Sequence, residues 1–338
     1  MSHLQHDPGG VFSDGNPSMI YEVPQRADII LAALQEAGVG PAFQATDHRI
    51  EPILAVHDAG LVNYLQMIYS QMKNYRNFAA PVYPSTFSSR SPQRKSIHPE
   101  ALPGYYCFGT ATPVLEGTWQ AAYWSAQCAL EAAEMLFKSH CSSYAICRPP
   151  GHHAGRDYYG GYCYLNNAAI ATRYLLQIPN APSQNRIAIL DIDYHHGNGT
   201  QDIFYDDDRV LYCSLHADPD QDYPYFWGSV GELGEGPGYG YNRNYPLPKG
   251  TTDRQYYNTL IMALDAITKF SPTYLVVSAG YDIGEDDPEG GFKISADGFY
   301  TIGKSIHSTG IPALIIQEGG YHLKNLSVWC RAFVAGFQ

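Results

Sequence analysis

Long apolar runs are missing from this 338-residue sequence, and so is a basic N-terminal stretch followed by an apolar segment. A helix that crosses a bilayer needs about 18 or more consecutive apolar residues, and a secretion signal needs the basic and apolar pattern. We therefore expect a cytoplasmic protein that has no membrane partner.

Cysteine pairs are missing as well. The seven cysteines form an odd set without a CxxC pair, and several lie inside apolar runs such as residues 144–147. Cysteines in such runs are typical of buried, reduced thiols, so the sequence gives no sign of a disulfide framework.

Basic residues are scarce: 21 Lys and Arg stand against 33 Asp and Glu, for a formal net charge of −12. This charge repels nucleic acid unless a local basic patch intervenes, and Arg90, Arg94 and Lys95 are too few to form one. We therefore expect no nucleic-acid partner. A small cationic substrate would be attracted, although the same charge also serves solubility.

The residues that are present indicate an α/β fold. Apolar residues make up 45% of the chain and charged residues only 16%, the balance of a globular protein. Short, β-rich apolar runs recur at residues 144–147, 187–190, 210–213, 274–277 and 313–316. Helix-like stretches lie before or between them at residues 24–37, 118–137, 167–176 and 254–270. This alternation predicts a parallel sheet covered on both faces. The absence of a repeat or a flexible linker favours a single domain over residues 1–338.

One segment, at about residues 77–104, has neither helical nor strand periodicity and holds five prolines. A loop of this length inside a compact domain is usually a binding element, a lid or an interface element, although it can also be a tolerated surface insertion.

Polar side chains follow four of the apolar runs, where the carboxyl ends of parallel strands form the ligand site of an α/β sheet. These segments are Arg148-Pro-Pro-Gly-His152-His153, Asp191-Ile-Asp193-Tyr-His195-His196-Gly-Asn198, Ser278-Ala-Gly-Tyr281-Asp282 and Gln317-Glu318-Gly-Gly-Tyr321. We expect them to converge.

Asp191, Asp193 and His195 are spaced by two residues, so in an extended chain their side chains share one side. Carboxylates crowded in a low dielectric need a cation. Asp282 from a neighbouring strand end completes a set of two carboxylates and one imidazole, which leaves an open position as in a catalytic metal site. Zinc suits these ligands, while iron, cobalt and manganese would also accept them.

These motifs resemble the arginase/deacetylase superfamily, specifically its zinc-dependent histone deacetylase branch. The resemblance runs from about Glu22 to the C-terminus, and Asn198 matches the class II and bacterial pattern. It implies a three-layer α/β/α domain around a parallel sheet of about eight strands. Asp193, His195 and Asp282 correspond to the zinc ligands.

Within this branch, residues 83–87, 104–113 and 117–119 are similar to bacterial acetylpolyamine amidohydrolases. In those enzymes the long insertion narrows the entrance and helps to build a dimer. The resemblance therefore implies hydrolysis of small acetylated amines, and a homodimer formed through residues 77–104.

The resemblance also implies the catalytic roles. His153 corresponds to the general base and acid, and His152 to its electrostatic partner, hydrogen-bonded to Asp191. Asn198 would orient His153. Tyr321 corresponds to the donor of a hydrogen bond to the developing oxyanion.

A structural potassium ion is implied too. In the family it binds residues that correspond to Asp191 and Ser214, together with the backbone carbonyls of Asp193, His195 and Leu215.

The substrate side chains implied are Tyr162 and Tyr223, which correspond to aromatic walls around a methylene chain. One position departs from the pattern, since Gly109 stands where the relatives usually carry an Asp that anchors the substrate. Glu100, nine residues upstream, could bind a distal ammonium or could be an ordinary surface residue.

Three other functions fit part of the pattern. A deacetylase for acetyl-lysine in proteins or peptides would use the same centre. An arginase-like ureohydrolase would need two manganese ions and further Asp ligands. A catalytically silent protein that binds acetylated amines is favoured only by Gly109.

Overall fold

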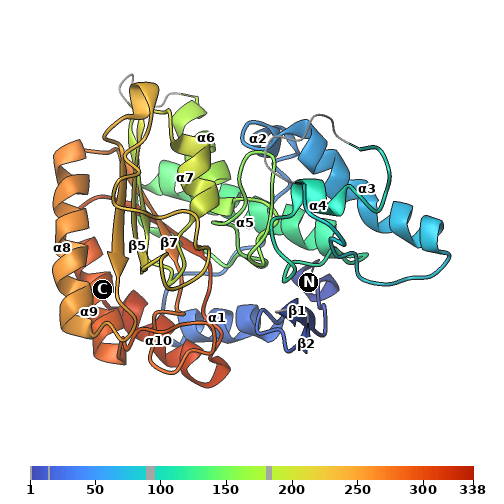
Figure 1. Ribbon diagram of the computed structural model, residues 1–338. Helices are drawn as coiled ribbons and strands as arrows, with labels where there is room; N and C mark the ends of the chain where they lie inside the picture. The colour runs from blue at the N-terminus through green and yellow to red at the C-terminus, as the bar shows by residue number, and fades with distance from the viewer. Residues whose placement is uncertain (1, 14–15, 89–95, 180–184) are drawn as a thin grey trace.

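The computed structural model describes residues 2–338 except 14–15, 89–95 and 180–184 (Figure 1). The α-helices are α1 (Gln25–Glu36), α2 (Glu51–Leu54), α3 (Ala59–Arg76), α4 (Pro103–Tyr106), α5 (Thr118–Ser139), α6 (Asn167–Gln177), α7 (Asn198–Phe204), α8 (Asp253–Phe270), α9 (Ala296–His307) and α10 (Leu323–Ala335). The strands are β1 (Val11–Ser13), β2 (Asn16–Ser18), β3 (Ser143–Ala145), β4 (Ile187–Asp191), β5 (Val210–Ala217), β6 (Asn242–Leu247), β7 (Tyr274–Ala279) and β8 (Ala313–Gln317). Short 3-10 helices cover Ser2–Gln5 and Gly236–Gly238.

The main sheet has the strand order β3-β8-β7-β4-β5-β6, and every neighbouring pair is parallel. The five apolar runs of the sequence are five of these strands, so the predicted parallel sheet is confirmed. The expected strand number of about eight is wrong for the described residues, where this sheet has six strands. Apart from the separate β1–β2 hairpin, other described segments pair only through single bridges, such as Val82 with Val114 and Cys107 with Tyr159, and add no strand to this sheet.

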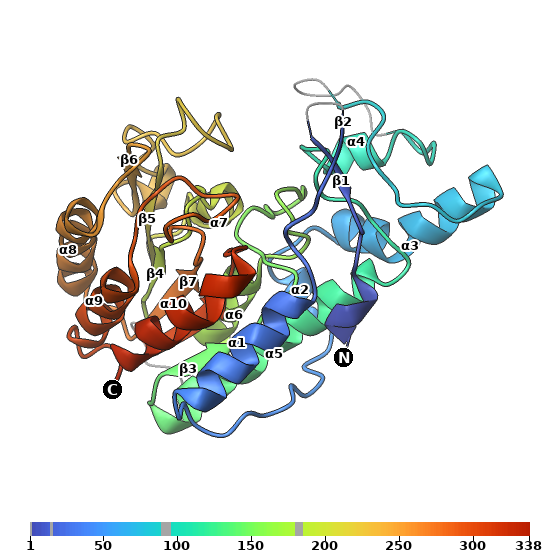
Figure 2. The ribbon, with the colours of Figure 1, turned by 90° about the horizontal axis from the view of Figure 1, so that it is seen from below.

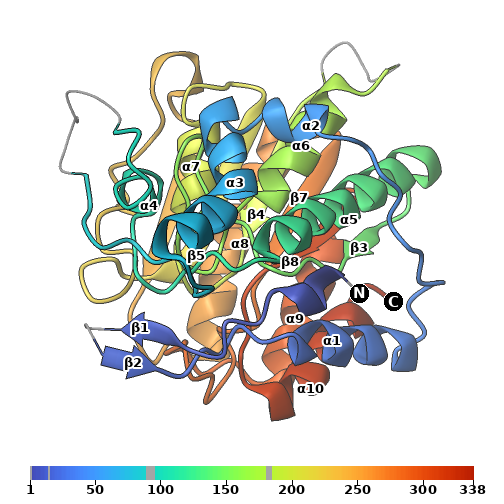
Figure 3. The ribbon, with the colours of Figure 1, turned by 90° about the vertical axis from the view of Figure 1, so that its right-hand side faces the viewer.

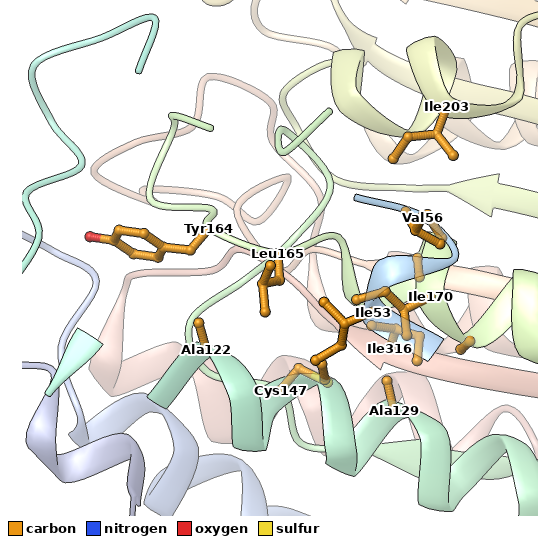
Figure 4. Close-up of a cluster of buried hydrophobic side chains, with 14 of the residues drawn as sticks. Ile53, Val56, Ala122, Ala129, Cys147, Tyr164, Leu165, Ile170, Ile203 and Ile316 are labelled. Atoms are coloured by element: carbon orange, nitrogen blue, oxygen red, sulfur yellow. The ribbon is translucent and has the colours of Figure 1, made fainter. Parts of the chain in front are cut away.

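Helices cover both faces of the sheet. Side chains alternate along each buried strand, so each strand has apolar side chains on both faces that pack against helices. Ile187 and Ile189 of β4 pack into a core that includes residues of α3, α5 and α6. Ala188 and Leu190 pack into a second core with α1, α8, α9 and α10. The predicted three-layer arrangement is therefore present (Figure 1). Figure 4 shows side chains of the first core, among them Ala122, Ala129, Ile170 and Ile316.

The helices begin and end where local side chains favour it. The side chain of Asn166 accepts a hydrogen bond from the Ala169 N–H at 2.9 Å and so caps α6. Thr252 and Gln255 form a reciprocal capping box at the start of α8. After α1, Gly38 takes a positive φ of 69°, which glycine adopts readily. The four predicted helices therefore lie within one or two residues of their expected bounds.

The first helix and the first two strands lie outside the main sheet. Helix α1 packs beside α10 (Figure 2). The hairpin of β1 and β2 stands apart from the main sheet (Figure 3).

Most of the described residues of the expected loop at 77–104 lack regular structure, but α4 begins at Pro103, inside the predicted range. Arg90, Arg94 and Lys95 lie outside the described residues. In the portion of the chain with described structure, no helix is both long and apolar enough to span a membrane.

Candidate active site

The strand ends bring together the side chains that the sequence singled out. Asp193 lies two residues beyond β4, Asp282 three beyond β7 and Tyr321 four beyond β8. The segment that carries His153 follows β3, which pairs with β8 at the same sheet. Because all these strands are parallel, their carboxyl ends meet at one edge.

Asp193, His195 and Asp282 form a compact group in which one ligand atom of each lies within 4.8 Å of the others. Nδ1 of His195 lies 3.4 Å from Oδ1 of Asp193 and 3.3 Å from Oδ2 of Asp282. The other carboxylate oxygens accept backbone hydrogen bonds. Gly319 N–H donates to Oδ2 of Asp193 at 2.8 Å, and Tyr194 N–H donates to Oδ1 of Asp282 at 3.0 Å. A Cβ on Gly319 would lie 2.4 Å from Oδ2 of Asp282, so glycine is required there.

The charges of this group indicate that it binds a cation. Oδ2 of Asp282 is buried and makes no well-formed hydrogen bond within the described residues, although Nδ1 of His195 lies 3.3 Å away. Burial and the Asp193 carboxylate raise the pKa of Asp282 to about 7, against the opposing effect of His195. Burial lowers the pKa of His195, but hydrogen bonds and charges from the two carboxylates outweigh burial and raise it well above 6.5. A divalent metal would supply the positive charge that a proton on His195 otherwise provides.

His152 and His153 lie side by side, with ring centroids 4.1 Å apart, and have opposite electrostatic surroundings. Burial lowers the pKa of His152, but Asp193 and Asp191 outweigh it and raise the pKa to about 10. Burial and the charges of His152 and its neighbours lower the pKa of His153 well below 6.5. His153 is therefore neutral at about pH 7 and available as a base.

Asn198 fixes the tautomer of His153. Nδ1 of His153 lies 2.8 Å from Oδ1 of Asn198, which accepts its hydrogen. Nε2 is then the ring atom that can accept a proton.

Asp191, at the end of β4, is fully buried and hydrogen-bonded on both oxygens. Oδ2 lies 3.2 Å from Nδ1 of His152 and accepts a hydrogen bond from the Tyr212 hydroxyl at 3.0 Å. Oδ1 accepts the backbone N–H of Asp193 at 3.2 Å. The expected contact between His152 and Asp191 is therefore present, and Tyr212 is a further partner that the sequence did not indicate.

Ser214 and Leu215 of β5 are fully buried next to Asp191. Ser214 lies in register with Asp191 across the β4–β5 pair, and its Oγ is 2.8 Å from Nδ1 of His216. A buried carboxylate and a hydroxyl on adjacent strands are oxygen donors of the kind that a hard cation binds.

Tyr321 is buried at the turn after β8. Its backbone N–H donates to Oδ2 of Asp287 at 2.7 Å. Burial raises the pKa of its hydroxyl well above 10, although the guanidinium of Arg26 opposes the shift. The hydroxyl therefore keeps its hydrogen and can donate it to an oxyanion.

Arg26 of α1 holds the turn that presents Tyr321. It donates to the carbonyls of Gly320 at 2.6 Å and Glu318 at 2.5 Å, and to Oε1 of Glu22 at 3.0 Å. Its guanidinium carbon lies 4.7 Å from the centroid of the Tyr321 ring. The role of Arg26 was not predicted, because the contact joins residues almost 300 positions apart.

Tyr162 and Tyr223 both lie at the site, as expected of residues that flank a substrate. The Tyr223 ring is 5.1 Å from that of His153, and the Tyr162 ring is 5.8 Å from that of Tyr321. Both side chains are half-buried. Phe108 stacks on Tyr223 with centroids 6.1 Å apart and planes at 17°.

Gly109 follows Phe108 and is half-buried. A Cβ at this position would meet no atom within 4 Å. The fold therefore has room for a Cβ at residue 109. The carboxylate is missing because the sequence has glycine here, and not because a neighbouring group would exclude it.

Glu318 and Glu289 are two further acidic residues at the site that sequence reasoning did not assign. Glu318 accepts the backbone N–H groups of Gly151 at 2.6 Å and His152 at 3.2 Å. Glu289 accepts the hydroxyl of Tyr162 at 3.2 Å. Glu318 stood in a recognised motif, but nothing in its spacing predicted this contact.

Comparison with known proteins shows to which family the chain is similar. Residues 20–337 match the family model of the histone deacetylase domain. The chain is 40% identical to acetylpolyamine amidohydrolase 1 of Pseudomonas aeruginosa, over 99% of this chain and 96% of that protein.

Solved structures agree with this match. An acetylpolyamine aminohydrolase from Burkholderia pseudomallei superposes with a TM-score of 0.93 at 38% identity, covering 99% of this chain and 96% of that chain. The HD domain of HDA15 superposes with a TM-score of 0.78 at 28% identity, covering 98% of this chain and 86% of that chain. The chain therefore belongs to the histone deacetylase family.

Proposed function

We propose that this protein, a deacetylase by its family, removes acetyl groups from small acetylated amines such as acetylpolyamines. One observation supports this chemistry most directly: Asp193, His195 and Asp282 lie together beside the neutral imidazole of His153. The substrate class is supported by relatives that are named acetylpolyamine amidohydrolases and match 99% and 91% of the chain.

The metal that we propose is zinc, held by the two carboxylates and the imidazole. The crowding of two buried carboxylates around one imidazole fits a divalent cation, and Oδ2 of Asp282 makes no well-formed hydrogen bond within the described residues. When bound, zinc would supply Lewis-acid polarisation of the acetyl carbonyl.

The protein's own side chains would move the protons. His153, oriented by Asn198, accepts a proton from the attacking water. Tyr321 donates a hydrogen bond to the carbonyl oxygen as negative charge develops there. His153 then gives the proton to the leaving nitrogen, the C–N bond breaks, and acetate and the free amine are released. His152, kept positively charged by Asp191 and Asp193, adds electrostatic stabilisation.

Tyr162 and Tyr223 would contact the methylene chain of the substrate on its way to the reacting group. Their half-buried rings lie next to Tyr321 and His153, respectively. Aromatic side chains of this kind bind an apolar chain without demanding a polar partner.

Potassium and dimerisation are further parts of the proposal. Asp191, Ser214 and the carbonyls of Asp193, His195 and Leu215 would bind a structural potassium ion. A second copy of the chain would pack through residues 77–104. A cytoplasmic location stays a prediction from the sequence.

A substrate panel tests this function. The purified protein, loaded with zinc, is assayed for acetate release from N-acetylputrescine, acetylspermidines and an acetyl-lysine peptide. We expect the highest kcat/KM for the acetylated polyamines. A higher kcat/KM for the peptide would instead assign the protein to the acetyl-lysine deacetylases.

A further inference from the structure

The base role of His153 depends on the direction in which the side-chain amide of Asn198 points. Oδ1 of Asn198 lies 2.8 Å from Nδ1 of His153 and accepts its hydrogen, which leaves Nε2 free to take up a proton. If the amide were turned over, Nδ2 would donate to Nδ1 instead, and the ring hydrogen would lie on Nε2. The imidazole would then have no lone pair on Nε2 with which to accept a proton.

The imidazole cannot decide this direction by itself. A side-chain amide has a donor end and an acceptor end, and either end can form a hydrogen bond with one tautomer of a neutral imidazole. Asn198 is fully buried at the start of α7, so bulk water does not orient its amide. A neighbouring group of the protein must therefore set the direction.

The hydroxyl of Tyr158 is placed to do this. It donates to the backbone carbonyl of Asn198 at 3.4 Å, and its oxygen accepts a hydrogen bond from Nδ2 of the same residue at 3.4 Å. Because the carbonyl takes the single hydroxyl hydrogen, only lone pairs are left for the side chain of Asn198. An amide oxygen in that place would meet a lone pair, so the hydroxyl favours Nδ2 there and Oδ1 at His153.

The ring of Tyr158 is packed so that its hydroxyl stays at this point. The ring stacks on that of Trp227, with centroids 6.4 Å apart and planes at 13°, and its centroid lies 5.7 Å from that of Phe108. A Cβ on Gly155 would lie 2.3 Å from the ring, so glycine at this position leaves room for it. Burial raises the pKa of the Tyr158 hydroxyl well above 10, so the group keeps its hydrogen and can donate it.

We propose that Tyr158 is a positioning residue for the reaction, which fixes the amide of Asn198 so that His153 keeps the tautomer that acts as a base. This inference rests on the proposed function, because it takes His153 as the base. Tyr158 acts through Asn198 and exchanges no proton with the substrate.

The proposal makes the effect of Tyr158 depend on the residue at position 198. A carboxylate there would need no group to orient it, since both of its oxygens accept hydrogen bonds and neither donates one. Removal of the Tyr158 hydroxyl should therefore matter beside an amide and not beside a carboxylate.

A double-variant comparison tests this dependence. Tyr158→Phe removes the hydroxyl and keeps the ring, and it is measured both in the wild type and in Asn198→Asp. Acetate release from N-acetylputrescine by the zinc-loaded protein gives kcat and KM. Tyr159→Phe is the matched control, since it removes the hydroxyl of the next residue, which lies 3.0 Å from the hydroxyl of Tyr64.

We expect Tyr158→Phe to lower kcat by about 3- to 10-fold, with KM and zinc content unchanged, because one neutral hydrogen bond sets the direction of the amide. In the Asn198→Asp background the same substitution should change kcat by less than about 2-fold, whatever the activity of that background. Tyr159→Phe should keep the kcat of the wild type.

Nitrogen NMR gives a second measurement that does not depend on turnover. Proteins with isotope-labelled histidine nitrogens are loaded with zinc, and the ring signals of His153 are identified by their loss in His153→Ala. The wild type should carry the ring hydrogen on Nδ1. Tyr158→Phe should show both tautomers of His153, whereas Tyr159→Phe should show only that of the wild type.

Three outcomes would overturn the inference alone: an unchanged kcat of Tyr158→Phe, a single Nδ1–H tautomer of His153 in that variant, or equal losses of kcat in the two backgrounds. If the wild type releases acetate from none of the acetylated amines, the proposed function fails. The tautomer of His153 in the wild type and in Tyr158→Phe then decides the inference separately.

Discussion

Two side chains at the site have different tasks that single substitutions can separate. Tyr321 supplies a hydrogen bond to the oxyanion, while His153 transfers the proton. Tyr321→Phe should lower kcat by about 10²- to 10³-fold and His153→Ala by about 10²- to 10⁴-fold. Neither residue belongs to the three-ligand group, so zinc content should stay the same in both. Near wild-type turnover in either variant, measured by acetate release, would contradict its assigned role.

The sequence predicted the metal-ligand group because Asp193 and His195 are two residues apart just after a buried strand, and Asp282 follows another such strand. Asp191 is the last residue of β4, and Asp193 and His195 follow it at alternate positions. The contacts of Arg26 and Glu289, in contrast, depend on turns that bring distant segments together, so no spacing in the sequence reveals them. Family resemblance supplied the roles of the other catalytic residues, and the fold brings those residues close to the group.

Helix α1 contributes Arg26 to the site, and this side chain bridges the carbonyls of Gly320 and Glu318. Arg26→Lys keeps the charge but loses the planar fork that binds both carbonyls. The turn that presents Tyr321 should then shift, and kcat should fall by roughly 10- to 100-fold with zinc still bound. Arg331→Lys, an exposed arginine paired with Glu36, is the control and should keep full activity. Equal kcat in the two variants would mean that α1 does not position Tyr321.

Among the elements, buried parallel strands were the easiest to predict because they are apolar on both faces. Strand β6 was missed: its sequence is largely polar, and it lies at the edge of the sheet, paired only with β5. The strand number implied by resemblance was too high for the described residues for a related reason. Described segments outside the named strands make single bridges instead of continuous ladders.

Across the whole molecule, buried neutral histidines should set the acid limit of stability. Burial lowers the pKa of His6, His57 and His216 to about 4, below the ordinary 6.5. Between these two pH values the unfolded chain binds more protons than the folded one. The free energy of unfolding should therefore fall as the pH is lowered through this window, by up to about 1.4 kcal/mol per pH unit for each histidine.

His57 allows a direct test, since its ring bridges the Gly155 carbonyl and the Asn166 N–H, both at 2.9 Å. Urea unfolding of the wild type and His57→Gln is compared at about pH 7 and pH 5. The variant should be less stable at pH 7 but should lose less stability on acidification. The difference between the two proteins removes the effect of pH on metal binding, and parallel losses would contradict the prediction.

Metal dependence is what the proposed chemistry requires above all. Protein freed of metal by a chelator is titrated with zinc, and acetate release from N-acetylputrescine is measured at each step, with Asp282→Asn as the comparison. We predict no acetate without metal, full activity at one equivalent of zinc per chain, and little activity for Asp282→Asn at the same zinc concentration. Undiminished acetate release by the metal-free wild type, or a requirement for two equivalents, would contradict a single zinc centre at Asp193, His195 and Asp282.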